Sequence, residues 1–406
     1  MKKSFLRSGH TPTLIAAFLY FDLSFMVWVM LGPLGVQIAA KLHLDPAQKG
    51  LMVAVPVLAG AVLRVACGIL VDRMGPKIAG VLGQTIVIAG LLAAWAFGLP
   101  SFHAVLAMGV VLGVAGASFA VALPLASRWY PPEYQGVALG IAGAGNSGTV
   151  LAALFAPGLA AAVGVNAVFG LAAIPLAIVL ALYLAMARNS PNQPAPKPLP
   201  NYFKVLRHAD AWWLMLFYSV TFGGFVGLAS SLTIYFHDQY GLAPVAAGYA
   251  TAACVFAGSM VRPVGGALAD RIGGVRALTG LYVIAAAALA AISLGLPTAA
   301  MELGVFVIAM LALGAGNGAV FQLVPQRFGR EIGMMTGLVG MAGGIGGFYL
   351  ASSLGYSKQI TGSYQSGFLI FALLAVVALL GLSVAKRRWR ATWGTNAAGA
   401  TGAVRI

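Results

Sequence analysis

Apolar residues dominate the chain in twelve long runs separated by short polar segments. Each run has about 20 residues or more, which is enough for a helix to cross a hydrocarbon core of about 30 Å. Backbone polar groups in lipid must be satisfied within the protein, so runs of this length predict membrane-spanning helices. The sequence therefore predicts an all-α polytopic membrane protein. The twelve runs are 13–38, 49–71, 78–97, 101–127, 135–162, 165–186, 210–236, 244–268, 277–296, 299–325, 333–356 and 364–385.

The longest polar stretch divides these runs six and six. It covers 188–209 and contains five prolines, which is typical of a semi-rigid linker. The sequence predicts a six-helix bundle at 1–187, a cytoplasmic linker at 188–209 and a second six-helix bundle at 210–390. Residues 391–406 are expected to form a disordered cytoplasmic tail.

The two halves repeat each other at an offset of 198 residues. Five residues that end the second run recur at the end of the eighth, with the same spacing in an apolar background. Chance is a poor explanation for five matched polar or glycine positions. The matched pairs are Arg64 and Arg262, Gly68 and Gly266, Asp72 and Asp270, Arg73 and Arg271, and Gly75 and Gly273.

Composition and charge agree with a membrane protein and exclude a nucleic-acid partner. Hydrophobic residues make up 60% of the chain and charged residues 8%, against about 25% charged in soluble domains. The net charge is +15, but nineteen Lys and Arg residues fall on one predicted side and three on the other. This asymmetry predicts that both termini are cytoplasmic. The basic C-terminal segment is then expected to contact anionic lipid.

The loop after the second run, repeated after the eighth, resembles the signature G-x-x-x-D-R-x-G-x-x-(K/R) of the major facilitator superfamily. This resemblance implies two pseudo-symmetric bundles and a substrate site near the membrane midplane, alternately open to each side. In this reading the loop residues form a conformational latch at the membrane surface. The latch residues are Gly68, Asp72, Arg73, Gly75, Gly266, Asp270, Arg271 and Gly273.

Three ionisable residues are predicted inside the membrane, where each has a considerable energetic cost. They are Asp22, Arg64 and Arg262. The repeat makes the two arginines symmetry mates, so both are expected to face the pathway from opposite bundles. A guanidinium stays charged and offers a planar fork of donors, which suits a small planar oxyanion such as nitrate. The alternative for Arg64 is a structural ion pair with Asp22.

Other residues near these positions offer donors and flat walls. Asn146 lies in a glycine-rich segment, while Phe119, Tyr218 and Phe222 lie in the fourth and seventh runs. A single aromatic residue in a membrane helix is usually a packing residue, and glycine-rich faces usually serve close helix approach. We expect helix packing from Gly140, Gly143, Gly145, Gly148, Gly337, Gly340, Gly343 and Gly344.

The Gly-Asn-x-Gly segment, its counterpart in the eleventh run, the paired arginines and the segment 20–28 are similar to the nitrate/nitrite porter family. This resemblance implies anion clamping by Arg64 and Arg262. It also implies an amide at Asn146 and sandwiching aromatics at Phe119, Tyr218 and Phe222. One departure is that Gly343-Gly344 stands where the first half has Gly145-Asn146, so the eleventh run supplies no side-chain amide.

These features predict a monomeric transporter of nitrate or nitrite in a bacterial inner membrane, working in nitrate assimilation. Asp22 suggests proton-coupled uptake, because an anion entering a cell at about −100 mV meets roughly 2.3 kcal/mol of opposition. Asp22 acting only as a counter-ion in a nitrate/nitrite exchanger remains open, as does transport of another small organic anion. A sensor without turnover also remains open. We expect no cofactor or metal and no enzymatic activity, and we expect Cys67 and Cys254 to be packing residues.

Overall fold

The structure, a computed structural model, describes residues 5–191, 193, 203–328 and 332–393. In this part of the chain every regular element is a helix. Twelve helical stretches are long and apolar enough to cross a membrane, which confirms the number and order of the predicted spans.

The chain forms two compact units. Unit 1 contains Met1–Pro198 and Ala229–Ala252, and unit 2 contains Leu199–Leu228 and Ala253–Ile406. The segment Ala229–Ala252 belongs to the second half by sequence order, yet it packs within unit 1. Close backbone approach explains this, because a Cβ atom added at Gly32 would collide with the backbone oxygen of Ser230.

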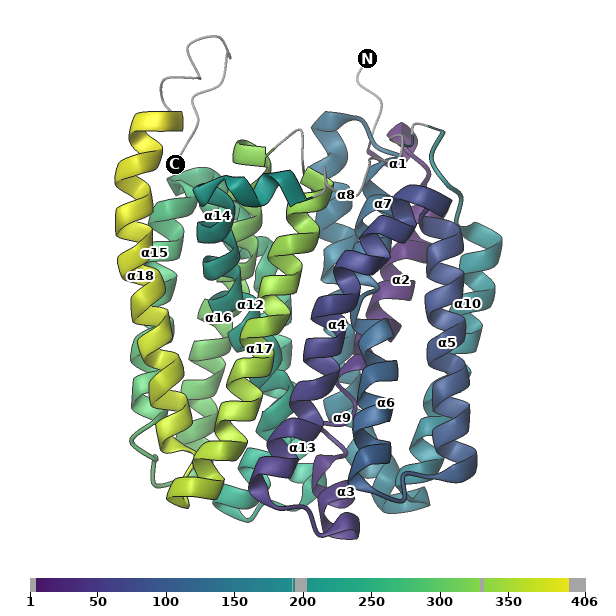
Figure 1. The fold of residues 1–406 in the computed structure, drawn as a ribbon, viewed down its shortest axis with the longest axis vertical. Helices are drawn as coiled ribbons and strands as arrows, with labels where there is room; N and C mark the ends of the chain where they lie inside the picture. The colour runs from purple at the N-terminus through teal and green to yellow at the C-terminus, as the bar shows by residue number, and fades with distance from the viewer. Residues whose placement is uncertain (1–4, 192, 194–202, 329–331, 394–406) are drawn as a thin grey trace. The chain divides into compact units, whose positions relative to one another are not determined.

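Unit 1 is built from the helices of the first half, in which α4 lies beside α6 and α5 beside α10 (Figure 1). In Figure 1, α1 lies at the upper end of this unit and α3 at its lower end. The helices are α1 (Phe5–Ser8), α2 (Thr11–Trp28), α3 (Gly35–Leu42), α4 (Pro46–Met74), α5 (Pro76–Phe97), α6 (Phe102–Gly116), α7 (Phe119–Ser127), α8 (Pro132–Gly143), the 3₁₀ turn η1 (Ala144–Ser147), α9 (Gly148–Val163) and α10 (Val165–Met186).

Unit 2 contains most of the second half, and α16 packs against both α14 and α15. α12 and α13 each contribute to both units, since Ala229–Ala252 belongs to unit 1. The elements are η2 (Phe203–Arg207), α12 (Ala209–Tyr240), α13 (Pro244–Met260), α14 (Arg262–Ile272), α15 (Gly274–Ile292), α16 (Ala299–Phe328), α17 (Ile332–Thr361) and α18 (Gln365–Trp393).

Local sequence explains where several helices begin. Asp45 and Gln48 form a capping box at the start of α4, where each side chain bonds the other's backbone N–H. His10 caps α2 by accepting the backbone N–H of Thr13 at 3.2 Å. Partial burial and the charge of Arg188 lower the pKa of His10, which favours the neutral ring that can accept this bond.

The first predicted span, 13–38, was too long. α2 ends at Trp28, and turns connect it to the separate helix α3. Pro33 accounts for this break, because proline supplies no backbone N–H and disfavours the helical conformation of the residue before it.

Three other spans are interrupted at points that the hydrophobic pattern did not reveal. The fourth breaks at 117–118, the fifth contains η1, and the eighth breaks at Val261, just before Arg262 and Pro263. At the C-terminus, α18 continues to Trp393, so residues 391–393 are helical and not part of a disordered tail. Residues 394–406 lie outside the described part of the chain.

Candidate functional site

Arg64 is a buried residue of unit 1. Its side chain comes from α4 and is 1% exposed. Its Nε donates to the backbone oxygen of Gly116 at 3.1 Å. Gly116 is the last residue of α6, so the break between α6 and α7 supplies a carbonyl that no helical N–H occupies. The helix break therefore orients the guanidinium.

Three aromatic rings surround this guanidinium. Its carbon Cζ lies 5.1 Å from the ring centroid of Trp28, 5.2 Å from that of Phe119 and 5.9 Å from that of Phe25. The Trp28 indole is itself held in place, because its Nε1 donates to the backbone oxygen of Pro56 at 2.8 Å. Cation–π attraction to these rings stabilises a charge that would otherwise be costly in the membrane.

Two glycines make room for the Trp28 ring. A Cβ atom added at Gly60 would lie 2.9 Å from its Nε1, and one added at Gly116 would collide with the same indole. Neither Trp28 nor these glycines were predicted to be site residues, although Trp28 ends the 20–28 segment used for the family resemblance. Trp28 lies one turn after Phe25, but aromatic residues are common in apolar runs, so this spacing did not single it out.

Asp22 is buried in α2 and is hydrogen-bonded near the end of the glycine-rich segment 140–148. Its Oδ1 accepts from the Ser147 hydroxyl at 2.7 Å. A Cβ atom at Gly148 would collide with the backbone oxygen of Asp22, and one at Gly145 would lie 2.5 Å from the Phe21 ring. The glycines at 145 and 148 thus permit the direct contact with α2 that brings Ser147 to Asp22.

Asn146 lies in the 3₁₀ turn η1 between α8 and α9 and is 1% exposed. A 3₁₀ segment within a longer helix often marks a functional position. Asn146 directly precedes Ser147, whose hydroxyl donates to the Asp22 carboxylate. Phe21 lies between the Gly145 segment and the surroundings of Arg64. Its ring is 5.8 Å from that of Phe119, which faces the Arg64 guanidinium.

In unit 2, Tyr218 and Phe222 form a parallel stack on α12. Their ring centroids are 5.1 Å apart with an interplanar angle of 6°. Gly343 of α17 lies against this stack, since an added Cβ atom would come within 2.9 Å of both rings. The structure therefore brings together the two predicted aromatics of this half and one of its predicted packing glycines.

Phe321 of α16, which was not predicted as a site residue, contacts both Arg262 and Tyr218. The Phe321 ring lies 5.5 Å from Cζ of Arg262 and makes an edge contact with the Tyr218 ring, with centroids 5.0 Å apart. Arg262 Nη1 is buried and has no hydrogen-bond partner among the described residues. This nitrogen is a buried donor that an anion would satisfy.

The two arginines thus share one arrangement, a guanidinium faced by a phenylalanine of the repeat-related helix. Phe119 faces Arg64 and Phe321 faces Arg262. The sequence did not single out Phe321, because aromatic residues are common in apolar runs.

The predicted packing role does not hold for every glycine. At Gly140, Gly143 and Gly337 an added Cβ atom would meet open space. Gly145, Gly148 and Gly343, by contrast, lie directly against neighbouring helices. Gly340 and Gly344 are buried.

In the predicted latch loops, the final glycines have a clear backbone role. Gly75 and Gly273 connect successive helices with φ of 84° and 96°, a conformation that favours glycine. Asp72 accepts from Arg128 Nη2 at 2.9 Å and so ties α4 to the end of α7. By contrast, Asp270 and Arg271 are exposed, and an added Cβ atom at Gly68 would meet open space.

In unit 2, a buried carboxylate binds side chains of other helices, and the sequence analysis did not predict it. Asp210 is buried in the first turn of α12 and accepts from Trp389 Nε1 at 3.0 Å and from Arg327 Nε. Arg388 Nε lies 3.6 Å from the same carboxylate. The sequence offered one sign of this site, because Asp210 is an acidic residue at the very start of the apolar run 210–236.

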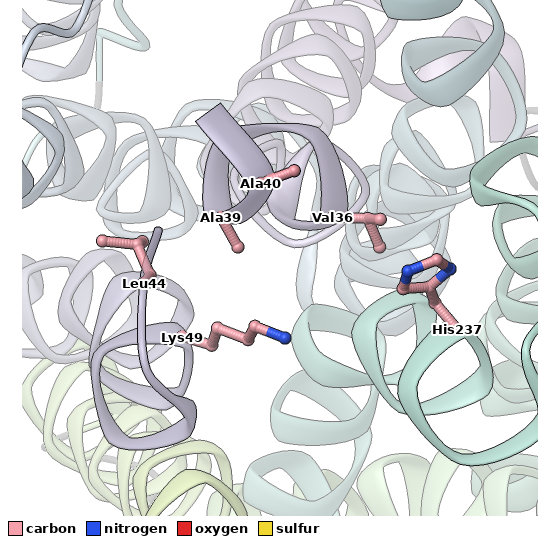
Figure 2. Close-up of a pocket in the computed structure, with 6 residues that line it drawn as sticks. All are labelled: Val36, Ala39, Ala40, Leu44, Lys49 and His237. Atoms are coloured by element: carbon pink, nitrogen blue, oxygen red, sulfur yellow. The ribbon is translucent and has the colours of Figure 1, made fainter. Parts of the chain in front are cut away.

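At the other end of unit 1, an ion pair joins segments from the two sequence halves. Lys49 Nζ lies 2.9 Å from Asp238 Oδ2. Beside it is a cavity of about 150 Å³, lined by Val36, Ala39, Ala40, Leu44, Lys49 and His237. Figure 2 shows the Lys49 side chain extending toward the side where His237 lies.

Comparisons with known proteins identify the family of this chain. The profile of the Major Facilitator Superfamily matches residues 14–351. The chain is 33% identical to the nitrite extrusion protein of Bacillus subtilis, over 88% of this chain and 89% of that protein. It is 32% identical to the probable nitrate/nitrite transporter NarK2 of Mycobacterium tuberculosis, over 91% and 95% of the two chains. It is 31% identical to the probable nitrate/nitrite antiporter NarK1 of Thermus thermophilus, over 89% and 88%.

Among solved structures, the human organic anion transporter MFSD10 has the same fold. It aligns with a TM-score of 0.69 at 16% identity, covering 92% of this chain and 99% of that one. Matches that span nearly all of both chains, together with the twelve spans and the repeated arginine motif, settle the family. The chain belongs to the major facilitator superfamily, in the branch formed by its nitrate and nitrite porters.

Proposed function

We propose that this protein carries nitrate, nitrite or both across the membrane by alternating access, and that it acts as a transporter and not as an enzyme. The names of the relatives at 31–33% identity support this substrate class. Within the superfamily, a substrate site at membrane depth and exposure to each side in turn are the expected mode of action.

The observation that carries the proposal is the pair of repeat-related arginines, each faced by a phenylalanine ring. We propose Arg64 and Arg262 as the cationic ligands of the anion. Asn146 adds an amide donor, and Phe119, Tyr218 and Phe222 add flat walls. Arg262 Nη1, a buried donor without a partner among the described residues, supports an anion in this role.

Nitrate and nitrite fit such ligands chemically. Both are planar and accept hydrogen bonds through oxygen, so a guanidinium can bind them through two parallel donors. They have no apolar tail, so the site needs charge, donors and aromatic faces and little else. A carboxylate substrate would use the same arginines but would also require a pocket for its organic part.

We further propose a bacterial inner-membrane location with both termini and the 188–209 linker in the cytoplasm, and a monomer as the working unit. The excess of Lys and Arg on the linker side supports this orientation. In this orientation the latch loop Gly68–Gly75 faces the cytoplasm. The Lys49–Asp238 ion pair, at the end of unit 1 opposite α1, then faces outward.

For energy coupling, we propose proton-linked nitrate uptake with Asp22 as the proton carrier. Its burial and its hydrogen bond to Ser147, beside Asn146, support a link between the carboxyl group and the anion site. A nitrate/nitrite exchanger is the second candidate, because one relative is named a nitrate/nitrite antiporter.

Counterflow in proteoliposomes tests the proposed substrate. Vesicles loaded with unlabelled nitrate or nitrite are expected to accumulate external labelled nitrate transiently, with saturation. Formate and lactate are the competitors that separate inorganic from organic anions. Saturable counterflow of lactate or formate, with none of nitrate or nitrite, would refute the proposal.

A further inference from the structure

Asn317 is a buried polar residue that the proposed function does not use. It lies in α16 and is 1% exposed, and its Oδ1 has no hydrogen-bond partner among the described residues. An amide buried without hydrogen bonds carries a considerable energetic cost, especially at membrane depth. Such a residue calls for a partner that the folded chain does not itself supply.

The packing of α16 shows which way Asn317 lies. A Cβ atom at Gly318 would collide with the backbone oxygen of Arg262, so that side of α16 faces α14. A Cβ atom at Gly316 would lie 2.6 Å from the Thr221 methyl group, so that side faces α12. With about 100° between successive residues, Asn317 lies in the angle between these two neighbours.

Phe321 occupies the same angle one turn along α16. Its ring touches Arg262 of α14 and Tyr218 of α12. Residues four apart lie on one face of a helix. Asn317 therefore lies one helical turn from the ring that covers the guanidinium of Arg262.

Two further polar atoms in this part of unit 2 have no hydrogen-bond partner among the described residues. They are Nη1 of Arg262 and Oγ1 of Thr221, and Thr221 is 1% exposed. A guanidinium, a hydroxyl and a carboxamide can all donate hydrogen bonds, and a half-turn of the amide exchanges its oxygen with its NH₂ group. A group that only accepts hydrogen bonds would satisfy all three, and a small oxyanion is such a group.

We propose that Asn317 is an anion-binding residue of this transporter, donating its amide N–H to the oxyanion held by Arg262. It supplies to the second half the side-chain amide that Gly344 of α17 lacks and that Asn146 supplies in the first half. The ligand class is a small inorganic oxyanion. The inference rests on the proposed nitrate and nitrite transport and deepens it.

Two variants and one control test this assignment. Asn317→Leu removes the amide, and Asn317→Asp keeps its shape but replaces the donor with a negative charge. The control is Gln84→Leu, which removes a buried amide whose Nε2 donates to the Leu176 backbone oxygen at 3.1 Å in the other unit. Two quantities are measured on purified protein: the KM for nitrate counterflow, and the rise in melting temperature that nitrate produces.

Asn317→Leu is expected to raise the KM roughly 10-fold or more, the effect of losing one hydrogen bond to a charged group. It should also reduce the nitrate-induced rise in melting temperature, because that rise depends on affinity. Asn317→Asp should lose both the nitrate-induced rise and saturable counterflow. Gln84→Leu should lower the anion-free melting temperature and keep the wild-type KM.

A KM within twofold of wild type in either Asn317 variant would overturn the inference, and Asn317→Asp decides the question if Asn317→Leu does not fold. Wild-type counterflow distinguishes failure of this inference from failure of the proposed function. Wild-type transport with unaffected Asn317 variants removes this inference alone. Absence of nitrate and nitrite counterflow in the wild type removes the proposed function, and this inference with it.

Discussion

At the residue scale, Arg64 shows how a permanent charge is kept inside the membrane. An arginine at the centre of a membrane helix costs about 2.5–3.5 kcal/mol on insertion scales. A hydrogen bond to a charged group contributes about 1.5–3 kcal/mol, and the Gly116 carbonyl accepts one. The rings of Trp28 and Phe119 add cation–π attraction. The surroundings of Arg64 are therefore sufficient to hold the charge without neutralising it.

Replacing Trp28 tests this role of the ring. Trp28→Leu removes a ring centroid 5.1 Å from the guanidinium carbon and the indole hydrogen bond to Pro56. We expect kcat/KM for nitrate to fall roughly 10- to 30-fold, because cation–π attraction in a water-excluded site contributes about 2 kcal/mol. Counterflow kinetics of purified protein provide the measurement.

The matched control is Trp95→Leu, since Trp95 is 55% exposed on α5. This variant is expected to keep wild-type kinetics. Equal kinetics in the Trp28 and Trp95 variants would show that the Trp28 ring has no part in anion handling.

At the scale of the element, the glycine-rich fifth span is held against α2 by contacts that admit no side chain. Gly145 and Gly148 lie at this contact, and the 3₁₀ turn η1 presents Ser147 to Asp22. Gly140 belongs to the same sequence motif but lies in α8 away from the contact. One motif therefore contains positions with different physical requirements.

Alanine substitutions separate these positions. Gly148→Ala is expected to destabilise the protein by about 1–3 kcal/mol or more, because overpacking forces the backbone of α2 away. Gly140→Ala is expected to be neutral or slightly stabilising, since alanine is favoured over glycine in a helix by roughly 0.5–1 kcal/mol. Thermal unfolding in detergent measures both changes. A melting temperature of Gly148→Ala equal to that of Gly140→Ala would contradict the packing described here.

Sequence patterns predicted the elements well and their interruptions poorly. Apolar runs long enough to span a membrane have one structural solution, so the twelve spans followed directly. The helix breaks at 117–118 and Val261 leave the hydrophobic pattern unchanged, although Pro263 at the start of α14 is a local signal for the second of them. Arg64 was identifiable because a charge in an apolar run stands out, whereas Trp28 and Phe321 were not, because aromatic residues are common in such runs.

At the scale of the whole molecule, alternating access requires contacts between the sequence halves to form and break. The Lys49–Asp238 ion pair is one such contact, linking the start of α4 to the end of α12 within unit 1. Close packing continues beside it, where an added Cβ atom at Gly35 would lie 2.6 Å from Ile234. The pair and this packing together join the two sequence halves at that end of unit 1.

Charge exchange tests whether the pair holds the closed arrangement. Lys49→Asp or Asp238→Lys places two like charges together, which should increase several-fold the labelling of Ile234→Cys by an impermeant maleimide. The background carries serine at Cys67 and Cys254. The double exchange restores attraction and should return labelling to the wild-type level. Labelling of the double variant as fast as that of the single variants would refute this role.

Proton coupling is likewise a property of the whole transport cycle. Asp22→Asn keeps an acceptor for the Ser147 hydroxyl but can no longer take up a proton. We expect nitrate uptake driven by a pH gradient to fall at least about tenfold, while nitrate/nitrite counterflow continues. Uptake that responds to the pH gradient as in the wild type would exclude Asp22 as the proton carrier.

The central claim is that two planar, permanently charged guanidinium groups bind the transported anion. Lysine at either position keeps the charge and loses the fork of donors, so nitrate counterflow by Arg64→Lys and by Arg262→Lys tests the claim most directly. Loss of one bidentate contact should lower kcat/KM roughly 10- to 100-fold in each variant, with melting temperatures close to wild type. Wild-type nitrate transport in both lysine variants would contradict the account.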